Sequence, residues 1–452
     1  MKHNEVLIKK YNQAVPRYTS YPTVPMWENN LDPFIWQELV KTAFKTYGKN
    51  EGIALYIHLP FCESLCTYCG CTKYITKNHE LEAPYIQTLL KEWGKYLELF
   101  ESKPLITGIH LGGGTPTFFS PESLDYLLSS ILSDCEISTD KEFSFEGHPN
   151  NTTKAHLKTL FDLGFDRVSF GIQDFDTKIQ ETIHRIQPLE KVIEVTNQAR
   201  EIGYQSVNFD LIYGLPFQNT STLRDTFNKV AELKPDRIAF YSYAHLPNSF
   251  KAQKSYEKHL PNEQEKRSLY ELGKNLLENL GYKEIGMDHF ALPEDPLFIA
   301  KKAGELHRNF MGYTTFPGKI MIGLGASSIS DIHLGYAQNE KNHKAYIAQV
   351  DDVDWAIQKG HISSDEDLLI SELILSLICS LQAKIPSEIW DKLPDNSIWK
   401  LQEMESEGIL CLEGKRVKIN ASGKAFIRNV CALFDLRMIH KKSLKMEFSK
   451  AI

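Results

Sequence analysis

The feature of this sequence that most restricts its fold is a repeated alternation of short apolar segments with amphipathic ones. Apolar residues spaced by three and four predict helices at Tyr85–Phe100, Leu124–Leu132, Glu190–Ile202 and Thr222–Leu233. Near-continuous apolar runs around these helices predict six strands: Ile53–Leu59, Ile106–Leu111, Glu142–Glu146, Arg167–Ile172, Ser206–Leu211 and Arg237–Tyr243. Such alternation is typical of parallel strands covered by helices, and six units predict an α/β fold with a partial barrel. In such a fold the loops after the strands carry the chemistry.

The pattern changes toward the end of the chain. We predict a helix at Gln264–Leu280 and strand-like segments at Glu284–Phe290 and Met321–Ser330, all placed with the barrel. After Ser363 the order becomes two helices and a small ribbon, which is typical of a winged-helix module: Asp367–Leu381, Ile398–Glu407, Ile409–Leu412 and Val417–Ile419. We therefore predict three parts, namely an N-terminal segment covering the barrel (1–50), the barrel with its extension (51–362), and a helical, winged-helix-like domain (363–452).

The charge of the chain bears on its partners. The 452 residues carry a formal net charge of −7, and the winged-helix-like region from Asp365 to Arg428 has more acidic than basic residues. A winged helix that binds DNA needs a basic surface, so we expect a structural or substrate-covering role and no nucleic-acid partner. The most apolar stretch, Leu368–Leu381, is interrupted by polar residues, so we expect no membrane span and a cytoplasmic location. We also expect the protein to be a monomer.

Four of the eight cysteines, Cys62, Cys66, Cys69 and Cys71, lie within ten positions directly after the first predicted strand. The first three have the spacing C-x3-C-x2-C, and three thiolates on one loop can each bind one iron of a 4Fe-4S cluster. The fourth iron is then open to S-adenosylmethionine (SAM). This spacing is the signature of radical SAM enzymes. The alternative is a zinc site using all four cysteines, which the spacing disfavours because zinc ribbons normally separate their ligands into two distant pairs.

Further segments of the sequence resemble the oxygen-independent coproporphyrinogen III oxidases. They run from about Tyr11 to Asp435 and include Pro16–Thr23, Leu111–Thr117, Gly171–Phe175, Asp210–Pro216, Tyr243–Pro247, Gly286–Phe290 and Leu306–Phe310. The resemblance implies a partial (βα)6 TIM-like barrel of the radical SAM type. It also implies a reaction in anaerobic haem biosynthesis, in which a 5′-deoxyadenosyl radical initiates decarboxylation of two propionates of coproporphyrinogen III to vinyl groups. The product is protoporphyrinogen IX, and an electron donor and an acceptor of unidentified nature are required.

The resemblance also implies roles for individual residues. Cys62, Cys66 and Cys69 are expected to hold the cluster. The family holds two SAM molecules, and the residues expected to bind them are Tyr56, Tyr68, Gly112, Gly113, Gly114, Thr115, Glu146, Gln173, Arg185, Asp210, Ala244 and Ile329. Missing Cβ atoms in the glycine run would let the backbone approach the ammonium and carboxylate of a ligand. Cys71 is expected to be surplus to the cluster but needed for catalysis.

The N-terminal segment Pro16–Thr23 is expected to lie over the barrel mouth. There Arg17 would act as a catalytic residue that meets a substrate propionate, with Arg308 as a second candidate, while Tyr18 and Tyr21 cover the macrocycle. His58 is either a hydrogen bonder in the core or a donor near the cluster.

One short segment, Gly147-His148-Pro149-Asn150, departs from the Asp-Pro-Arg run that is commoner in the family, so a local contact is expected to differ there. Three other functions compete with the oxidase. They are a haem chaperone of the same superfamily, a radical SAM methyltransferase acting on haem, and a non-enzymatic zinc or DNA-binding protein.

Overall fold

The computed structural model describes residues 2–352 and 355–440, which divide into two units. We call residues 30–298 and 318–359 the barrel unit, and residues 1–29, 299–317 and 360–452 the C-terminal unit. This division differs from the one predicted, because residues 1–29 and 299–317 group with the C-terminal residues. Residues 441–452, the end of the predicted C-terminal domain, lie outside the described residues. None of the described helices is long and apolar enough to cross a membrane.

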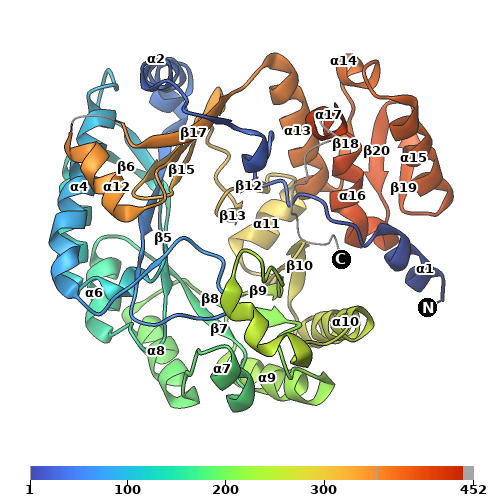
Figure 1. Ribbon diagram of the computed structural model, residues 1–452, viewed down its shortest axis with the longest axis horizontal. Coiled ribbons are helices and arrows are strands. Elements are labelled where there is room, and N and C mark those ends of the chain that lie inside the picture. Colours follow the sequence, from blue (N-terminus) through green and yellow to red (C-terminus); the bar gives the residue numbers. More distant parts are fainter. Residues whose placement is uncertain (1, 353–354, 441–452) are drawn as a thin grey trace. The chain divides into compact units, whose positions relative to one another are not determined.

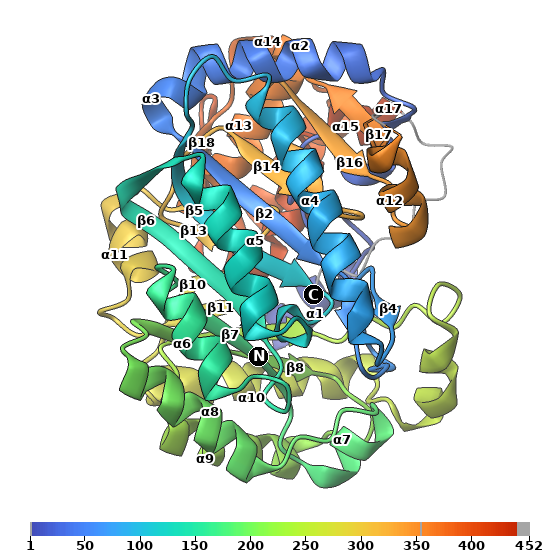
Figure 2. The same ribbon diagram turned by 90° about the vertical axis from the view of Figure 1, so that its left-hand side faces the viewer.

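Parallel strands form the centre of the barrel unit. They are neighbours in chain order, so the six predicted strands are confirmed with their ends shifted by a few residues. Their bounds are β2 (Ile53–Leu59), β5 (Leu105–Gly113), β6 (Glu136–Gly147), β7 (Arg167–Gln173), β8 (Ser206–Tyr213) and β9 (Arg237–Ser242). Helices between the strands cover one face of the sheet (Figures 1 and 2): α4 (Glu82–Leu97), α5 (Pro121–Ser133), α6 (Lys154–Asp162), α7 (Thr177–Thr182), α8 (Leu189–Ile202) and α9 (Thr220–Leu233).

Further strands extend the sheet on both sides. Strand β14 (Met321–Leu324) is parallel to β2, and β15 (Ile329–Asp331) returns antiparallel to β14. The predicted segment Met321–Ser330 is therefore two strands joined by a turn. Beyond β9 the hairpin β10 and β11 continues the sheet. The other elements of this unit are α2 (Pro33–Ala43), α3 (Lys49–Glu51), β3 (Phe61–Cys62), β4 (Tyr74–Ile75), α10 (Glu263–Asn279), β10 (Lys283–Gly286), β11 (His289–Ala291), β16 (Gly335–Asn339) and α12 (His343–Asp351).

The two faces of the central strands differ in polarity. One face packs under the helices and is fully apolar, with Leu55, Ile57, Ile109, Phe145, Val168 and Phe209 all buried. The opposite face is polar and only partly buried, and it carries Tyr56, His110, Glu146, Ser169, Asn208 and Asp210. The expectation of near-continuous apolar strands was therefore wrong. Alternation along each strand sends every second side chain to the face opposite the helices α4–α9.

The C-terminal unit contains the two helices and the ribbon that were predicted, with a strand and a further short helix between the two helices. Its three-stranded sheet has the order β18, β20, β19, and β18 was not predicted from the sequence. The module consists of α13 (Asp365–Ser380), β18 (Gln382–Lys384), α14 (Ser387–Trp390), α15 (Asp395–Ser406), β19 (Leu410–Glu413) and β20 (Arg416–Ile419). The remaining elements are α1 (Lys2–Tyr11), β1 (Glu28–Asn29), β12 (His307–Asn309), β13 (Gly312–Thr314), α16 (Ile427–Ala432) and α17 (Leu436–His440), with α11 (Pro296–Ala303) and β17 (Ile357–Ile362) at the unit boundaries.

The N-terminal segment Pro16–Thr23 is bound within the C-terminal unit. Arg308 Nη1 donates to the carbonyl oxygens of Arg17 and Tyr18 at 3.1 and 3.0 Å, and Tyr18 donates to Asp435 at 3.1 Å. The rings of Tyr18 and Tyr21 are only 5% and 2% exposed. The expectation that they cover the macrocycle was therefore wrong, because both rings pack as core of this unit.

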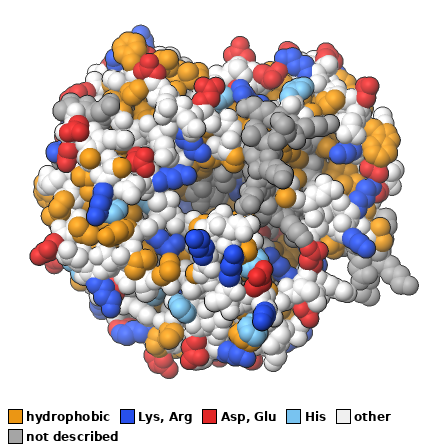
Figure 3. Space-filling view, in the orientation of Figure 1, with side chains coloured by type: hydrophobic (Ala, Val, Ile, Leu, Met, Phe, Trp, Pro, Cys, Tyr) orange, Lys and Arg blue, Asp and Glu red, His pale blue; other side chains and the backbone are white. Residues whose placement is uncertain are grey.

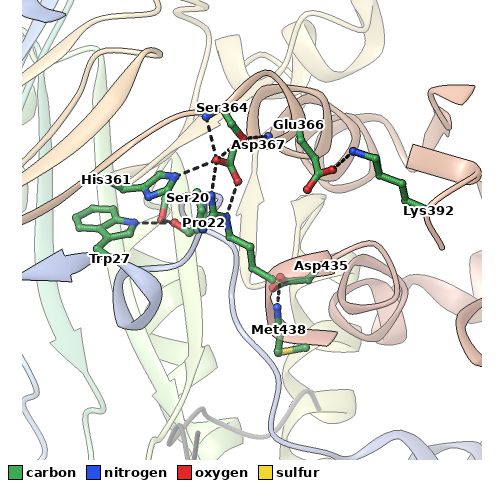
Figure 4. A network of polar contacts seen from close by, with 11 residues as sticks. Ser20, Pro22, Trp27, His361, Ser364, Glu366, Asp367, Lys392, Asp435 and Met438 are labelled. Carbon is green, nitrogen blue, oxygen red and sulfur yellow. Dashed lines mark hydrogen bonds and ion pairs between the residues drawn. The ribbon is translucent and has the colours of Figure 1, made fainter. Parts of the chain in front are cut away.

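A second polar network, centred on Asp367, fixes the start of α13 (Figure 4). The carboxylate of Asp367 accepts from His361 Nε2 at 3.0 Å, from Ser364 Oγ at 2.8 Å and from Arg437 Nε at 2.6 Å. Burial raises the pKa of Asp367, but the hydrogen bonds from His361, Arg437 and Ser364 outweigh it and hold the pKa well below its usual value. The network therefore stabilises the charged carboxylate.

We expect Asp367→Asn to lower the free energy of unfolding by about 3 kcal/mol, because it removes one member of a buried, charged network. Urea denaturation at pH 7 measures this loss. Since the folded-state pKa is depressed, the contribution of Asp367 is present above the unfolded pKa of about 4 and is lost as the pH falls toward the folded pKa. Glu366→Gln is the control, because Glu366 pairs with Lys392 at an exposed position and should contribute less than about 1 kcal/mol. Equal losses in the two variants would contradict the assignment.

Candidate active site

The cysteine loop begins where β2 ends and is held by backbone hydrogen bonds. Strand β3 pairs in parallel with β4, and the carbonyl of Cys62 accepts from Thr76 N at 2.9 Å. Cys62 and Cys66 are buried, Cys69 is partly buried and Cys71 is exposed. The loop therefore turns its first cysteines inward and leaves the fourth accessible.

Polar groups surround the predicted cluster ligands. Thr115 Oγ1 donates to Cys62 Sγ and Arg185 Nη1 donates to Cys66 Sγ, each at 3.4 Å. Burial raises the pKa of Cys62 to about 11, whereas a hydrogen bond from Cys71 lowers the pKa of Cys69 to about 6. Hydrogen-bond donors and a guanidinium beside thiols favour the thiolate form that a metal requires.

The donor set fits a 4Fe-4S cluster, which takes one thiolate per iron. In the part of the chain that the structure describes, no three His, Cys, Asp or Glu side chains lie close enough to bind a single metal ion.

The glycine run at the end of β5 lets that strand pass very close to the cysteine loop. A Cβ on Gly113, which has φ of +113°, would lie 2.7 Å from the ring of His58, and one on Gly114 would lie 2.6 Å from Pro60. A Cβ on Gly112 would lie 3.1 Å from Tyr56. Packing within the chain therefore requires glycine at these positions. The predicted contact with a ligand would be a second reason for glycine there.

His58 ties β2 to the far end of the cysteine loop. Its Nε2 donates to the carbonyl of Thr72 at 3.0 Å, so Nδ1 is left to accept from the hydroxyl of Tyr56 at 3.1 Å. Burial lowers the pKa of His58, which keeps the ring neutral. Of the two roles considered from the sequence, the hydrogen bonder in the core is the one that the geometry supports.

Two carboxylates lie on the polar face of the sheet, Glu146 on β6 and Asp210 on β8. Asp210 accepts from Ser169 Oγ at 3.1 Å and from Asn208 Nδ2 at 2.9 Å. Burial, with a smaller contribution from the charge of Glu146, raises the pKa of Asp210 to about 6. Glu146 Oε1 lies 3.6 Å from His110 Nε2. The two predicted carboxylates thus lie near enough to interact.

Gln173 ends β7, and Arg185, in the loop after α7, binds the end of this strand. Arg185 donates to the carbonyl of Gly171 through Nε at 3.1 Å and Nη2 at 2.6 Å. Gln173 has φ of +68° at a β-bulge, a conformation that costs energy in a non-glycine residue and is common at functional sites. A Cβ on Gly171 would lie 2.7 Å from the side chains of both residues. Arg185 therefore connects this strand end to the cysteine loop.

Tyr68 and Ala244 are joined by a residue that the sequence analysis missed. Gln253, which is 1% exposed, donates from Nε2 to the carbonyl oxygens of Tyr68 at 3.4 Å and Ala244 at 3.2 Å. Tyr68 packs against the apolar cluster that includes Tyr243 and Tyr256. No motif marks Gln253, because its role arises only when distant loops meet.

Ile329 begins β15, and the turn before it is held by a second missed residue, Glu92. The Glu92 carboxylate accepts from Gly325 N at 2.8 Å, Asn339 Nδ2 at 2.6 Å and Tyr346 OH at 2.6 Å. Burial raises the pKa of Glu92 to about 7. An acidic residue on the apolar face of a predicted helix is the signal that could have identified it.

The predicted site residues thus fall into two groups. Residues at the ends of β2, β5, β6, β7, β8 and β9 lie at one edge of the sheet with the cysteine loop, as predicted. Arg17 belongs to the C-terminal unit, and its part in the site stays a prediction. Arg308 is buried and clamps the backbone of the N-terminal segment, so its geometry favours a structural role.

Comparisons with known proteins identify the family. The sequence matches the Radical SAM superfamily over residues 56–230. It is 37% identical to the oxygen-independent coproporphyrinogen III oxidase of Synechocystis, over 99% of this chain and 97% of the relative. The enzyme of that name from Helicobacter pylori is 38% identical, over 94% and 95%. The solved structure of coproporphyrinogen III oxidase from Escherichia coli, a radical SAM enzyme, matches with a TM-score of 0.87 at 34% identity, covering 96% of this chain and 98% of that one. This chain therefore belongs to the oxygen-independent coproporphyrinogen III oxidases of the radical SAM superfamily.

Proposed function

We propose that this protein converts two propionates of coproporphyrinogen III to vinyl groups and so forms protoporphyrinogen IX in anaerobic haem biosynthesis. One observation carries the proposal. The loop with Cys62, Cys66 and Cys69 meets the ends of six parallel strands in a chain that is alignable over nearly its full length with oxidases of this name. The net change at each propionate is loss of one hydrogen atom from the β-carbon, of carbon dioxide and of one electron.

The thiolates of Cys62, Cys66 and Cys69 would hold the 4Fe-4S cluster. When bound, this cluster supplies the electron that cleaves SAM to a 5′-deoxyadenosyl radical. Within the chain, Thr115 and Arg185 donate to cluster thiols, and His58 keeps the loop against β2. These contacts would hold the cysteines at fixed positions before the cofactors bind.

Two SAM molecules are part of the proposal. The backbone of Gly112–Gly114, with Tyr56, Thr115 and Glu146, would hold the first beside the cluster. Asp210 would accept a hydrogen bond from a ribose hydroxyl. The remaining predicted contacts are Tyr68, Gln173, Arg185, Ala244 and Ile329.

Coproporphyrinogen III is the partner that the family name supports. We propose that the protein works in the cytoplasm as a monomer, with a separate electron donor and acceptor. Acidic and basic side chains are interspersed on the face drawn in Figure 3, and the net charge of the chain is −7. We therefore propose no nucleic-acid partner, because such a partner requires a basic surface.

The test is anaerobic turnover of the reconstituted protein with reductant, SAM and coproporphyrinogen III, followed by mass spectrometry of the porphyrins. We expect protoporphyrinogen IX and two molecules of carbon dioxide per porphyrinogen. Haem binding without any product would instead indicate the haem chaperone, and a methylated or ring-opened haem would indicate the methyltransferase.

A separate prediction concerns Arg17. If its guanidinium binds a propionate, Arg17→Ala should raise the KM for coproporphyrinogen III by about tenfold, the loss expected for a charged hydrogen bond. The dissociation constant of SAM should not change. Arg416→Ala, at an exposed position of β20, is the control. An unchanged KM would remove Arg17 from the site.

A further inference from the structure

The turn after β6 contains the segment in which this chain departs from the commoner pattern of its family. In this turn the backbone N–H of Asn150 donates to His148 Nδ1 at 3.1 Å. The side chain of Asn150 donates from Nδ2 to the carbonyl of Ile186 at 2.9 Å, and Thr152 Oγ1 donates to the carbonyl of His148 at 3.0 Å. The contact with Ile186 therefore holds the turn against the residue that follows Arg185.

These hydrogen bonds fix the tautomer of His148. A backbone N–H can only donate, so Nδ1 must be the acceptor and the ring proton must lie on Nε2. Burial, followed by the charge of the nearby Arg185, lowers the pKa of His148 well below its usual value, so the ring is neutral. Among the residues that the structure describes, Nε2 has no hydrogen-bond partner, and His148 is only partly buried. The ring thus offers a fixed donor to a ligand.

Arg185 supplies donors at the same place. A guanidinium has five N–H groups. Those on Nε and Nη2 reach the carbonyl of Gly171, and one on Nη1 reaches Cys66 Sγ. Among the described residues the other N–H groups have no hydrogen-bond partner, so they and the positive charge are left for a ligand. Arg185 and His148 therefore combine a charged, planar hydrogen-bond donor with a neutral hydrogen-bond donor.

We propose that His148 and Arg185 form a subsite for a carboxylate, in which Nε2–H of His148 donates to one carboxylate oxygen beside the guanidinium. This proposal rests on the proposed function, because that reaction brings carboxylates to this end of the sheet. The carboxylate has two possible sources, the α-carboxylate of SAM and a propionate of the porphyrinogen. Of these two residues, only Arg185 was expected from the sequence to bind a cofactor.

The decisive variant is His148→Asn. Asparagine keeps an acceptor for the N–H of Asn150 but removes the donor at the Nε2 position. We expect binding of the carboxylate ligand to weaken by about tenfold, the usual loss for a hydrogen bond to a charged group. The dissociation constant of SAM is measured without turnover, by titrating the electron paramagnetic resonance signal of the reduced cluster. The KM for coproporphyrinogen III is measured at saturating SAM.

The two readouts separate the sources. A raised dissociation constant for SAM, with no change for its decarboxylated analogue, assigns the subsite to the α-carboxylate. A raised KM for coproporphyrinogen III with unchanged SAM binding assigns it to a propionate. His148→Gln, whose amide N–H can approach the Nε2 position, should recover part of the lost binding. If neither constant changes more than twofold in His148→Asn, the proposal is overturned.

His184→Asn is the matched control, because His184 is the exposed neighbour of Arg185 and its φ of +53° suits asparagine. It should bind both ligands as the unmodified protein does. If His148→Asn fails to retain the cluster, the same titrations on His148→Gln decide: binding should weaken there by more than twofold but by less than tenfold, and unchanged binding of both ligands would overturn the proposal. Failure of the proposed function is a different result, because the unmodified protein would then form no protoporphyrinogen while the titration of SAM could still be carried out.

Discussion

Replacing any one of Cys62, Cys66 or Cys69 with serine is expected to prevent stable cluster assembly and to reduce decarboxylation below detection. Each thiolate would hold one iron, and a serine hydroxyl is a harder and far less acidic ligand than a thiol. The iron and sulfide content after anaerobic reconstitution measures the loss, and the absorbance of the cluster gives an independent reading. Full iron content in any of these variants would show that the altered cysteine is not a ligand.

Cys71→Ser is the matched control for this series. Cys71 lies in the same loop but is exposed, and its backbone carbonyl accepts from Lys73 Nζ at 3.3 Å. We expect Cys71→Ser to keep the iron content of the unmodified protein while losing decarboxylation activity. Iron loss equal to that of the other three variants would instead make Cys71 a ligand.

The sequence predicted the centre of the fold because short strand segments, each with one apolar face, alternate with amphipathic helices. Strand β2 was predicted with its observed ends. The parallel pairing of β14 with β2, in which Ile322 lies opposite Leu55, could not be predicted, because no local periodicity records a pairing between such distant segments. The grouping of residues 1–29 with the C-terminal unit was missed for the same reason. It depends on single contacts such as that of Tyr18 with Asp435.

The site was predictable where a residue belongs to a motif or ends a strand. Residues that act by joining two loops were missed, and Gln253 and Glu92 are the clearest examples. Glu92 satisfies three donors, from the turn before β15, from β16 and from α12, and this role depends on the folded arrangement rather than on its neighbours in sequence. The prediction that Tyr18 and Tyr21 cover the substrate macrocycle failed because aromatic side chains in an N-terminal segment can pack into a protein core as readily as against a ligand.

Gly113→Ala is expected to cause the largest loss of activity among substitutions outside the cysteines. An alanine Cβ would lie 2.7 Å from the His58 ring, so the ring must move away from the carbonyl of Thr72 and the hydroxyl of Tyr56. The loop that carries the cysteines would lose its connection to β2. Since a displacement of about 1 Å in an active site can lower the rate by about 100-fold, we expect a decarboxylation rate at least about 100-fold lower. Turnover and SAM binding are measured on variants with matched iron content.

Because Gly113 has a positive φ, alanine there also strains the backbone, independently of the collision with His58. Gly281→Ala measures the effect of backbone strain without a collision. Gly281 has φ of +93° with no atom within 4 Å of its Cβ position, so alanine there adds backbone strain of about 1–2 kcal/mol without a collision. We expect Gly281→Ala to lower the melting temperature but to leave turnover and SAM binding unchanged. Gly113→Ala should lower both the melting temperature and turnover. If both variants retained full activity at equal loss of stability, the close approach of β5 to His58 would have no part in positioning the cysteine loop.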